Sequence, residues 1–219
     1  MKIGVINAGN IGRALAKPWH DAGHELLLAK IGNQAKLDEF VQEMDGVLRG
    51  TPRQAAEFGE IVLFSVYWPH LDAALAEVDD LAGKLVIDTM NPLKVNDRFE
   101  HYHDLEFMQS SSTSEELQKR LPHARIVKAF STLPAAMLDV TQWSGNPTTP
   151  AIFVAGDDPS AKEVVFQLVR DTGLQPLDVG PLSNARSIEQ LGVLLHHVGM
   201  HQFGGHYERL APTLVQAFF

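Results

Sequence analysis

The chain has 219 residues, of which 45% are hydrophobic, so it can bury a sizeable core. Its formal net charge of -9 argues against nucleic acid or an anionic membrane surface as a partner, since both need a basic surface. It contains no cysteine, which excludes disulfides, thiolate catalysis and cysteine-held metals. No apolar run has the length of a membrane helix, and the chain opens on a strand rather than a signal peptide, so a soluble cytoplasmic protein is expected.

The opening residues have the layout of a nucleotide-binding unit. An apolar run at 3–6 is followed by the turn at 7–12, Asn-Ala-Gly-Asn-Ile-Gly, and then by a helix-like run. In a dinucleotide-binding βα unit, such a turn points backbone N–H groups at a pyrophosphate, and the helix start adds partial positive charge. Asn7 replaces the first glycine of the pattern, and asparagine tolerates left-handed backbone better than most residues. The alternative is a plain α/β turn.

Strands and helices alternate along the rest of the chain. Further strands are predicted at residues 25–29, 47–49, 61–66, 85–88, 126–130, 152–155 and 175–179. Helices are predicted at residues 10–22, 33–44, 71–78, 110–121, 135–138, 161–172 and from 187 onward, with one more beginning after Thr51. Pro18 is expected to kink or end the first helix near Lys17. Residues 89–108 are predicted to be mostly a polar loop.

This alternation predicts an α/β fold with a doubly wound, mostly parallel sheet that is covered on both faces. Residues 1–182 would form the sheet domain. Residues 183–219 would form a small helical segment that packs on it or on a partner subunit. The apolar tail ends in Phe218 and Phe219, which favours a homodimer.

In such a sheet, ligands bind outside the carboxyl ends of the strands. The loops at residues 7–12, 29–33, 65–69, 88–93 and 129–132 are therefore expected to converge on one crevice. The second of these loops selects the cofactor, because an acid there binds the ribose of NAD whereas cations bind the 2′-phosphate of NADP. No acid is present, while Lys30 and, one helical turn or so later, Lys36 favour NADP. The alternative is that both lysines are solvated surface charges.

Other polar residues carry weaker signals. Ser131 and Thr132 can donate to a carboxamide or to a substrate carbonyl, although such residues are often local backbone caps. His197 and His201 share a helical face, but no carboxylate completes a ligand set, so no metal site is predicted. These histidines are expected to line an interface or a ligand pocket, and His197 is taken as a candidate substrate contact.

Five stretches carry a family resemblance: Gly-Asn-Ile-Gly at 9–12, the segment 84–93 with its Asn-Pro pair, 124–130 ending in Lys-Ala-Phe, 153–158 and 173–191. In order and spacing they resemble the small NADP-linked oxidoreductases typified by coenzyme F420-dependent NADP reductase. They are also similar to the NAD(P)-binding domain of the STEAP metalloreductases. Together the stretches span nearly the whole chain.

The resemblance implies a Rossmann-type domain with a small C-terminal segment over the nicotinamide end. Together with the residue patterns above, it gives the candidate cofactor-binding residues Asn7, Ala8, Gly9, Asn10, Ile11, Gly12, Lys30, Lys36, Ser65, Val66, Tyr67, Asn91, Pro92 and Ala129. Ser131, Thr132 and His197 remain the candidate substrate contacts. In the family, hydride passes directly between the nicotinamide and a stacked flavin or deazaflavin such as coenzyme F420, so no catalytic residue is assigned.

Three positions depart from the family's usual pattern. Asn7 replaces a glycine, residues 31–32 (Ile-Gly) replace a Ser-Arg pair, and Ser131 replaces an asparagine. Without that arginine, Lys30 remains as a point charge for the phosphate. The third departure changes a hydrogen-bond donor near the reacting centre. The identity of the molecule that accepts the hydride is therefore left open.

Three functions are compatible with these residues. The first is an NADP-dependent oxidoreductase that acts on a flavin-like, deazaflavin-like or small carbonyl acceptor. The altered glycine turn motivates a second, a nucleotide-sensing module without turnover. The C-terminal histidines motivate a third, a metal-ion reductase.

Overall fold

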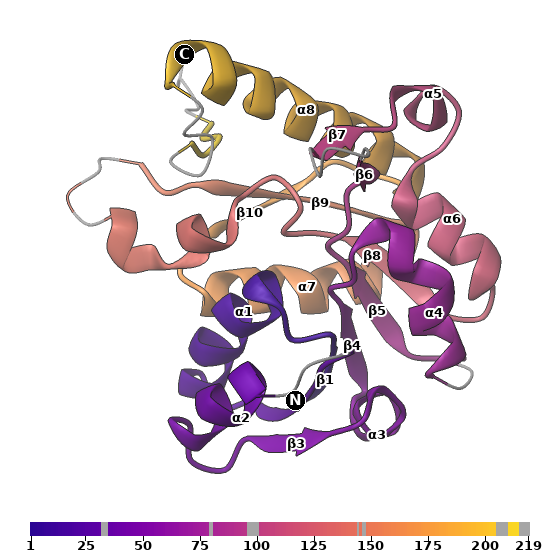
Figure 1. Cartoon of the computed structure of the whole chain (residues 1–219), viewed down its shortest axis with the longest axis vertical. Helices are drawn as coiled ribbons and strands as arrows, with labels where there is room; N and C mark the ends of the chain where they lie inside the picture. The colour runs from indigo at the N-terminus through magenta and orange to yellow at the C-terminus, as the bar shows by residue number, and fades with distance from the viewer. Residues whose placement is uncertain are drawn as a thin grey trace.

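A computed structural model describes residues 1–31, 35–78, 81–95, 101–143, 145, 148–204 and 210–214. The strands of its main sheet are β1 (Lys2–Ile6), β2 (Glu25–Ala29), β3 (Leu48–Gly50), β4 (Ile61–Phe64), β5 (Leu85–Asp88), β8 (Arg125–Lys128), β9 (Ala151–Gly156) and β10 (Gln175–Asp178). Their order is β10-β9-β8-β5-β4-β1-β2-β3 (Figure 1). Neighbouring strands run parallel except β8 and β9, which are antiparallel. The predicted doubly wound, mostly parallel fold is confirmed.

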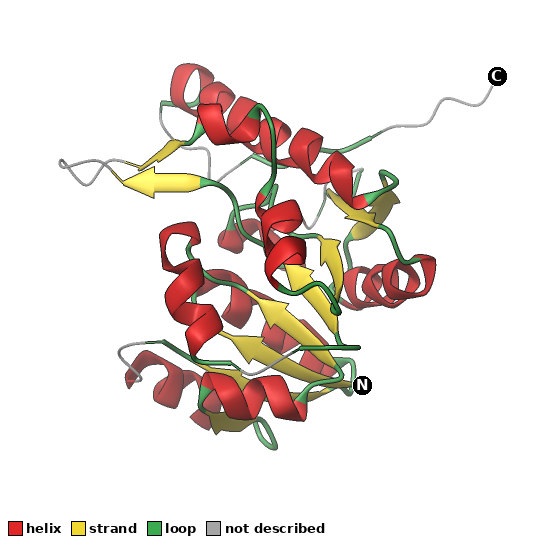
Figure 2. Ribbon diagram, turned by 90° about the vertical axis from the view of Figure 1, so that its right-hand side faces the viewer, coloured by secondary structure: helices red, strands yellow, loops and turns green. Residues whose placement is uncertain are grey.

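Helices cover both faces of this sheet, as Figure 2 shows. The helices α1 (Asn10–Asp21), α2 (Ala35–Gln42) and α7 (Pro159–Asp171) contribute to the core on one face. On the other face lie α3 (Pro52–Phe58), α4 (Leu71–Ala76) and α6 (Thr113–Arg120). The predicted start of α3 is confirmed, because Thr51 and Gln54 form a reciprocal capping box.

Helix α8 (Ala185–Gln202) lies along one end of the molecule, beside a small hairpin (Figure 1). The hairpin strands are β6 (Leu93–Val95) and β7 (His101–His103), and α5 (Leu105–Met108) follows them. Short 3-10 turns complete the described elements at Trp68–His70, Ala135–Leu138, Val140–Trp143 and Leu182–Asn184. Beyond α8, residues 210–214 return to the sheet, where the Ala151 N–H donates to the Pro212 carbonyl at 2.9 Å.

The structure corrects two predictions about elements. Pro18 does not end helix α1 near Lys17, because the helix continues through Pro18 to Asp21, close to the predicted span of residues 10–22. Proline removes only its own N–H donor, and the Pro18 carbonyl still accepts from the Ala22 N–H at 3.0 Å. Within residues 89–95 and 101–108, where a loop was predicted, the structure instead has β6, β7 and α5. The hairpin depends on cross-strand pairing, which a weak local apolar pattern does not reveal.

Helix α1 packs closely on β1 because residue 12 has no side chain. A Cβ at Gly12 would lie 3.0 Å from Val5 Cγ1 and 3.5 Å from the Asn7 carbonyl oxygen. This close approach brings the start of α1 directly against the turn that follows β1.

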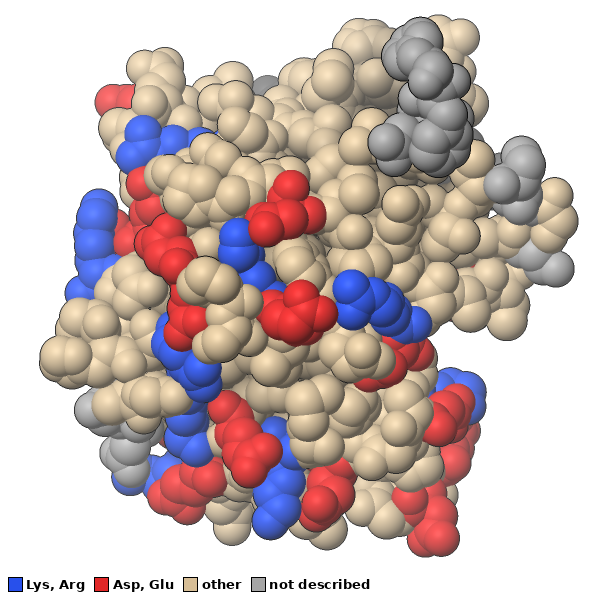
Figure 3. All heavy atoms as spheres, turned by 180° about the vertical axis from the view of Figure 1, so that it is seen from behind, with Lys and Arg blue, Asp and Glu red and all other residues tan. Residues whose placement is uncertain are grey.

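Within the described part of the chain, no helix combines the length and the apolar character needed to cross a membrane. On the face seen in Figure 3, acidic and basic side chains alternate over the lower half. They form no single-sign patch on this face.

We expect Gly12→Val to lower the free energy of unfolding by about 2 to 3 kcal/mol, because the added methyl groups overlap Val5. Urea denaturation measures this. Lys17→Val, at an exposed site on the same helix, controls for helix propensity and should cost only about 0.5 kcal/mol. Equal losses in the two variants would contradict the close packing of α1 on β1.

Candidate functional site

The turn after β1 has the left-handed residue that the glycine pattern requires. Asn7 has φ 61°, so asparagine adopts the conformation expected of the missing glycine. The Gly9 N–H donates to the Asn7 carbonyl at 2.6 Å, which closes the turn. The Asn7 side chain donates from Nδ2 to the Ser65 carbonyl at 2.9 Å. The loops after β1 and β4 are thus joined, as the prediction of converging loops requires.

Helix α1 begins directly from this turn. Gly9 is its N-cap residue and supplies no side-chain cap to the first N–H groups. Arg13, in the first turn of the helix, donates from Nη1 to the Ala8 carbonyl at 3.3 Å and from Nη2 to Asn10 Oδ1 at 3.1 Å. The sequence reasoning missed Arg13, although a cation in the first turn after a glycine turn was a usable signal.

A cavity of about 700 Å³ lies at the carboxyl ends of β2 and β3. Its lining is Lys30, Ile31, Arg49, Gly50, Thr51, Pro52, Gln54 and Glu77. The predicted Lys30 is therefore at this cavity, and Arg49 joins it from the neighbouring strand. The side chain of Lys36 lies outside the described residues, as do residues 32–34.

A second, smaller cavity of about 160 Å³ lies between the ends of β5 and β8 and helix α8. Its lining is Asn91, Leu93, His103, Ser131, Thr132, Leu133, Pro134, Gly192, Leu195, His196 and Leu210. Three of the predicted site residues, Asn91, Ser131 and Thr132, meet here. His197 is not in this lining: its side chain is exposed, and its neighbour His196 takes the place on the inner face of α8.

Two polar atoms of the small cavity are buried without a hydrogen-bond partner among the described residues. They are Asn91 Oδ1 and Ser131 Oγ. The other end of the amide is fixed, since Asn91 Nδ2 donates to the Ser131 carbonyl at 2.8 Å. A buried polar atom without a partner is costly, so this pair marks a place where a ligand with a complementary donor and acceptor can bind.

The predicted residues on the loops after β4, β5 and β8 that remain line neither of these cavities. Val66, Pro92 and Ala129 are buried, whereas Tyr67 is partly exposed and its ring lies 5.7 Å from that of His70. The Ala129 N–H donates to the Asp88 carbonyl at 3.1 Å, so the chains leaving β8 and β5 are tied together. The loops after β1, β4, β5 and β8 are thus linked in pairs at one edge of the sheet.

Histidines line the outer wall of the small cavity. The rings of His103 and His196 meet edge to face, with centroids 5.6 Å apart. Burial, together with the neighbouring His196 and His197, lowers the pKa of His103 to about 4. Burial also lowers the pKa of His196, so both rings are neutral at pH 7. In the described part of the chain, no three His, Asp or Glu side chains form a metal site, and His206 lies outside that part.

A buried charge network lies beneath the small cavity. Lys128, at the end of β8, is fully buried, and its Nζ lies 3.2 Å from Asp88 Oδ2 and 2.8 Å from Glu189 Oε1. Nζ also donates to the Met90 carbonyl and to Thr113 Oγ1. Burial lowers the pKa of Lys128, but the two carboxylates outweigh this and raise its pKa above the usual value. Lys128 is therefore charged.

Glu189 is the residue through which α8 joins this network. Its Oε1 accepts from the Thr113 N–H at 2.9 Å as well as from Lys128, while no partner for Oε2 lies among the described residues. Burial raises the pKa of Glu189 more than Lys128 lowers it. One cation thus faces two buried carboxyl groups, and for one of them, Glu189, burial disfavours the charged form. The sequence reasoning did not identify Lys128 or Glu189 as partners.

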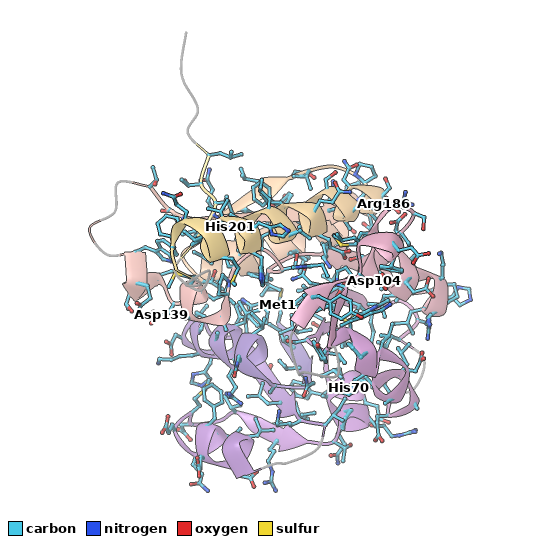
Figure 4. The ribbon with its side chains drawn as sticks, turned by 45° about the horizontal axis from the view of Figure 1, so that its top comes forward. Met1, His70, Asp104, Asp139, Arg186 and His201 are labelled. Carbon is cyan, nitrogen blue, oxygen red and sulfur yellow. The ribbon has the colours of Figure 1, made fainter. Side chains whose placement is uncertain are left out.

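A second contact holds the start of α8. Arg186 forms a two-pronged ion pair with Glu115 of α6, with both N–O distances at 2.7 Å. Arg186 lies at the beginning of α8 and His201 near its end, as Figure 4 shows. The helix is therefore held to the body of the protein at its first two turns, and one of its histidines, His196, lines the small cavity farther along.

Residues 2–92 match the family model described as NADP oxidoreductase coenzyme F420-dependent. A solved structure from Arthrobacter sp. FB24, named as a proposed F420-dependent NADP reductase, superposes with a TM-score of 0.81 at 27% identity, covering 91% of this chain and 94% of that one. The resemblance to the F420-dependent NADP reductases is confirmed. The family that this chain resembles is a family of oxidoreductases.

Curated relatives fall into the two groups expected from the sequence. F420-dependent NADP reductase from Methanothermobacter marburgensis is 28% identical, covering 89% of this chain and 91% of its own. Metalloreductase STEAP3 from Rattus norvegicus is 26% identical over 89% of this chain. The matched region is only 37% of that metalloreductase, so this chain spans little more than a third of its length.

We expect Lys128→Met to lower the free energy of unfolding by about 3 to 5 kcal/mol, because two buried carboxyl groups lose their cation. Glu189→Gln should cost less than about 1.5 kcal/mol, since glutamine keeps the oxygen that accepts from Lys128 and burial already disfavours a charge at this position. Chemical denaturation of both variants measures the difference. A Glu189→Gln loss as large as that of Lys128→Met would contradict the charge assignment.

We expect the stability of the protein to fall as the pH drops from 6.5 toward 4, in part through His103. The unfolded ring binds its proton near pH 6.5 and the folded ring only near pH 4, so acid favours the unfolded chain in this window. The ring is half-buried and partly screened by solvent, so His103→Asn should remove about 1 to 2 kcal/mol of this pH dependence. Melting curves across the window measure it, with exposed His201→Asn as the matched control. An unchanged slope in His103→Asn would refute the prediction.

Proposed function

We propose that this protein is an NADP-dependent oxidoreductase that moves hydride between NADP(H) and a flavin-like, deazaflavin-like or small carbonyl acceptor. The observation that carries this proposal is the small cavity at the carboxyl ends of β5 and β8, with its paired free acceptor and donor. The family match at residues 2–92 supports the same conclusion.

The turn after β1 would bind the pyrophosphate. Its residues, Asn7, Ala8, Gly9, Asn10, Ile11 and Gly12, lead into the first turn of α1, whose N–H groups have no side-chain cap. A helix N-terminus of this kind favours an anion through its free N–H groups and its partial positive charge. Arg13, which already contacts Ala8 and Asn10, would add a full positive charge at the same place.

The small cavity would hold the nicotinamide ring. Asn91 Oδ1 can accept from a carboxamide NH2 group, and Ser131 Oγ can donate to the carboxamide oxygen. A cavity of about 150 Å³ holds one benzene ring, so 160 Å³ is the right size for a single six-membered ring. Ser65, Val66, Tyr67, Pro92 and Ala129 would then lie along the adjoining ribose, and Thr132 would face the acceptor.

When bound, NADPH supplies a hydride from its nicotinamide ring and becomes NADP+. The acceptor takes up the hydride and is thereby reduced by two electrons. The contribution of the protein is to position the two rings and to exclude water. Leu93, Leu133 and Leu195 provide the apolar wall for this. His103 and His196 are neutral and able to donate a hydrogen bond, so an uncharged carbonyl or ring nitrogen of the acceptor suits this wall.

The C-terminal segment, residues 183–219, would act as the cover of this site, with α8 as its main wall. We also propose a homodimer. Leu194, Val198 and Met200 on α8 are exposed, at 57%, 38% and 51%, and a second copy would remove them from water. Sedimentation over a range of protein concentrations tests this, and a monomer throughout the range would refute it.

A thermal-shift titration with NADPH, NADH, flavins and a deazaflavin tests the main proposal, followed by turnover with the same acceptors and a panel of small carbonyls. We expect NADPH to raise the melting temperature most, and nicotinamide absorbance to change when the right acceptor is present. Binding of NADPH without turnover by any acceptor would instead favour a nucleotide-sensing module. Turnover only with ferric or cupric ions would favour a metal-ion reductase.

We expect Asn91→Ala and Ser131→Ala each to weaken NADPH binding by about fivefold to tenfold, because each removes one hydrogen bond to the carboxamide. Calorimetric titration measures the affinities. Adenosine 2′,5′-bisphosphate, which has no nicotinamide, is the control ligand and should bind these variants as it binds the wild type. Parallel losses for both ligands would place the nicotinamide elsewhere.

A further inference from the structure

The cavity at the ends of β2 and β3 presents two cations on adjacent strands. Strand β2 pairs with β3 in parallel, with Leu28 opposite Arg49 and Ala29 opposite Gly50. Lys30 follows β2 directly, so its side chain and that of Arg49 line the same 700 Å³ cavity. One cationic residue thus comes to this cavity from the loop after β2 and the other from β3.

The position of this cavity matches one part of the cofactor. In a doubly wound sheet, the end of β2 faces the adenosine ribose, and a cation there accommodates the 2′-phosphate that distinguishes NADP from NAD. The loop after β2 contains no acid that would bind a free ribose hydroxyl. Glu77, just after α4, also lines the cavity. Its carboxylate can accept a hydrogen bond from an amino group of a bound ligand.

Arg49 is held at the cavity by a neighbouring carboxylate. Its Nη1 donates to Asp38 Oδ1 on α2, and the Arg49 side chain remains 52% exposed. A guanidinium has five N–H donors in a planar fork, so one bond to Asp38 leaves donors that can bind two phosphate oxygens. A lysine ammonium offers only a point charge. Of the two cations, Arg49 is therefore the one able to select a phosphate by geometry.

We propose that Arg49, from the end of β3, is the residue that gives this protein its preference for NADP(H) over NAD(H). It binds the 2′-phosphate of the adenosine ribose together with Lys30, and Asp38 orients its guanidinium. This assignment rests on the proposed function, and it names a residue outside the β2 loop from which phosphate specificity was first expected.

The test compares the affinities of NADPH and NADH for wild type, Arg49→Gln and Arg49→Lys by calorimetric titration. We expect Arg49→Gln to weaken NADPH by about tenfold to a hundredfold and to change NADH by less than twofold, because only NADPH carries the phosphate. Arg49→Lys should fall between, since it keeps the charge and loses the fork. Arg53→Gln is the matched control: this exposed arginine on α3 does not line the cavity, and its loss should change both affinities by less than twofold.

The outcomes separate this inference from the proposed function. If wild type binds both nucleotides and Arg49→Gln weakens neither, or weakens both equally, the assignment of Arg49 is overturned while the proposed function stands. A loss in Arg53→Gln as large as that in Arg49→Gln would also overturn it, because the effect would then be general electrostatics. If wild type binds neither nucleotide, the proposed function itself fails. Because Arg49 is exposed, its substitutions should leave the fold intact. The melting temperature of each variant checks this.

Discussion

The buried cation of Lys128 is the interaction on which the site depends. It lies at the end of a central strand and contacts groups from β5, α6 and α8 at once. A lone buried charge would be too costly to keep, so the folded core must hold its carboxyl partners as well. One of these partners, Glu189, belongs to α8. Lys128, at the end of β8, therefore also holds the C-terminal helix α8 against the carboxyl ends of the strands.

The network also determines where the cavity residues point. Lys128 binds the Met90 carbonyl, and the Met90 N–H donates to Asp88 Oδ1, so the peptide just before Asn91 is fixed from both sides. The Asn91 Nδ2 group then donates to the Ser131 carbonyl, which leaves Asn91 Oδ1 buried and without a partner among the described residues. Pre-organisation of this kind lets a hydride-transfer enzyme work without an acid or base, because placement of the two rings is the main requirement.

Phosphate recognition illustrates how a motif can be lost while its chemistry is kept. The sequence after β2 lacks the arginine of the resembling family, which leaves Lys30 there as a point charge for the phosphate. In the folded chain, the neighbouring strand brings Arg49 to the same cavity. Parallel strands place all their carboxyl ends at one edge, so a charge can move from one loop to the next and still reach the ligand.

The sequence by itself determined the alternation of strands and helices, the left-handed role of Asn7, the capped start of α3 and the set of loops that meet at one edge. Each of these depends on local pattern or backbone preference, which neighbouring residues reveal. Only the tertiary structure decided that α1 runs through Pro18, that residues 93–103 include a hairpin, and that His196 rather than His197 lines the small cavity. It also brought together Lys128 with Glu189 and Lys30 with Arg49. These facts depend on packing and charge pairing between residues far apart in the chain, which no local pattern records.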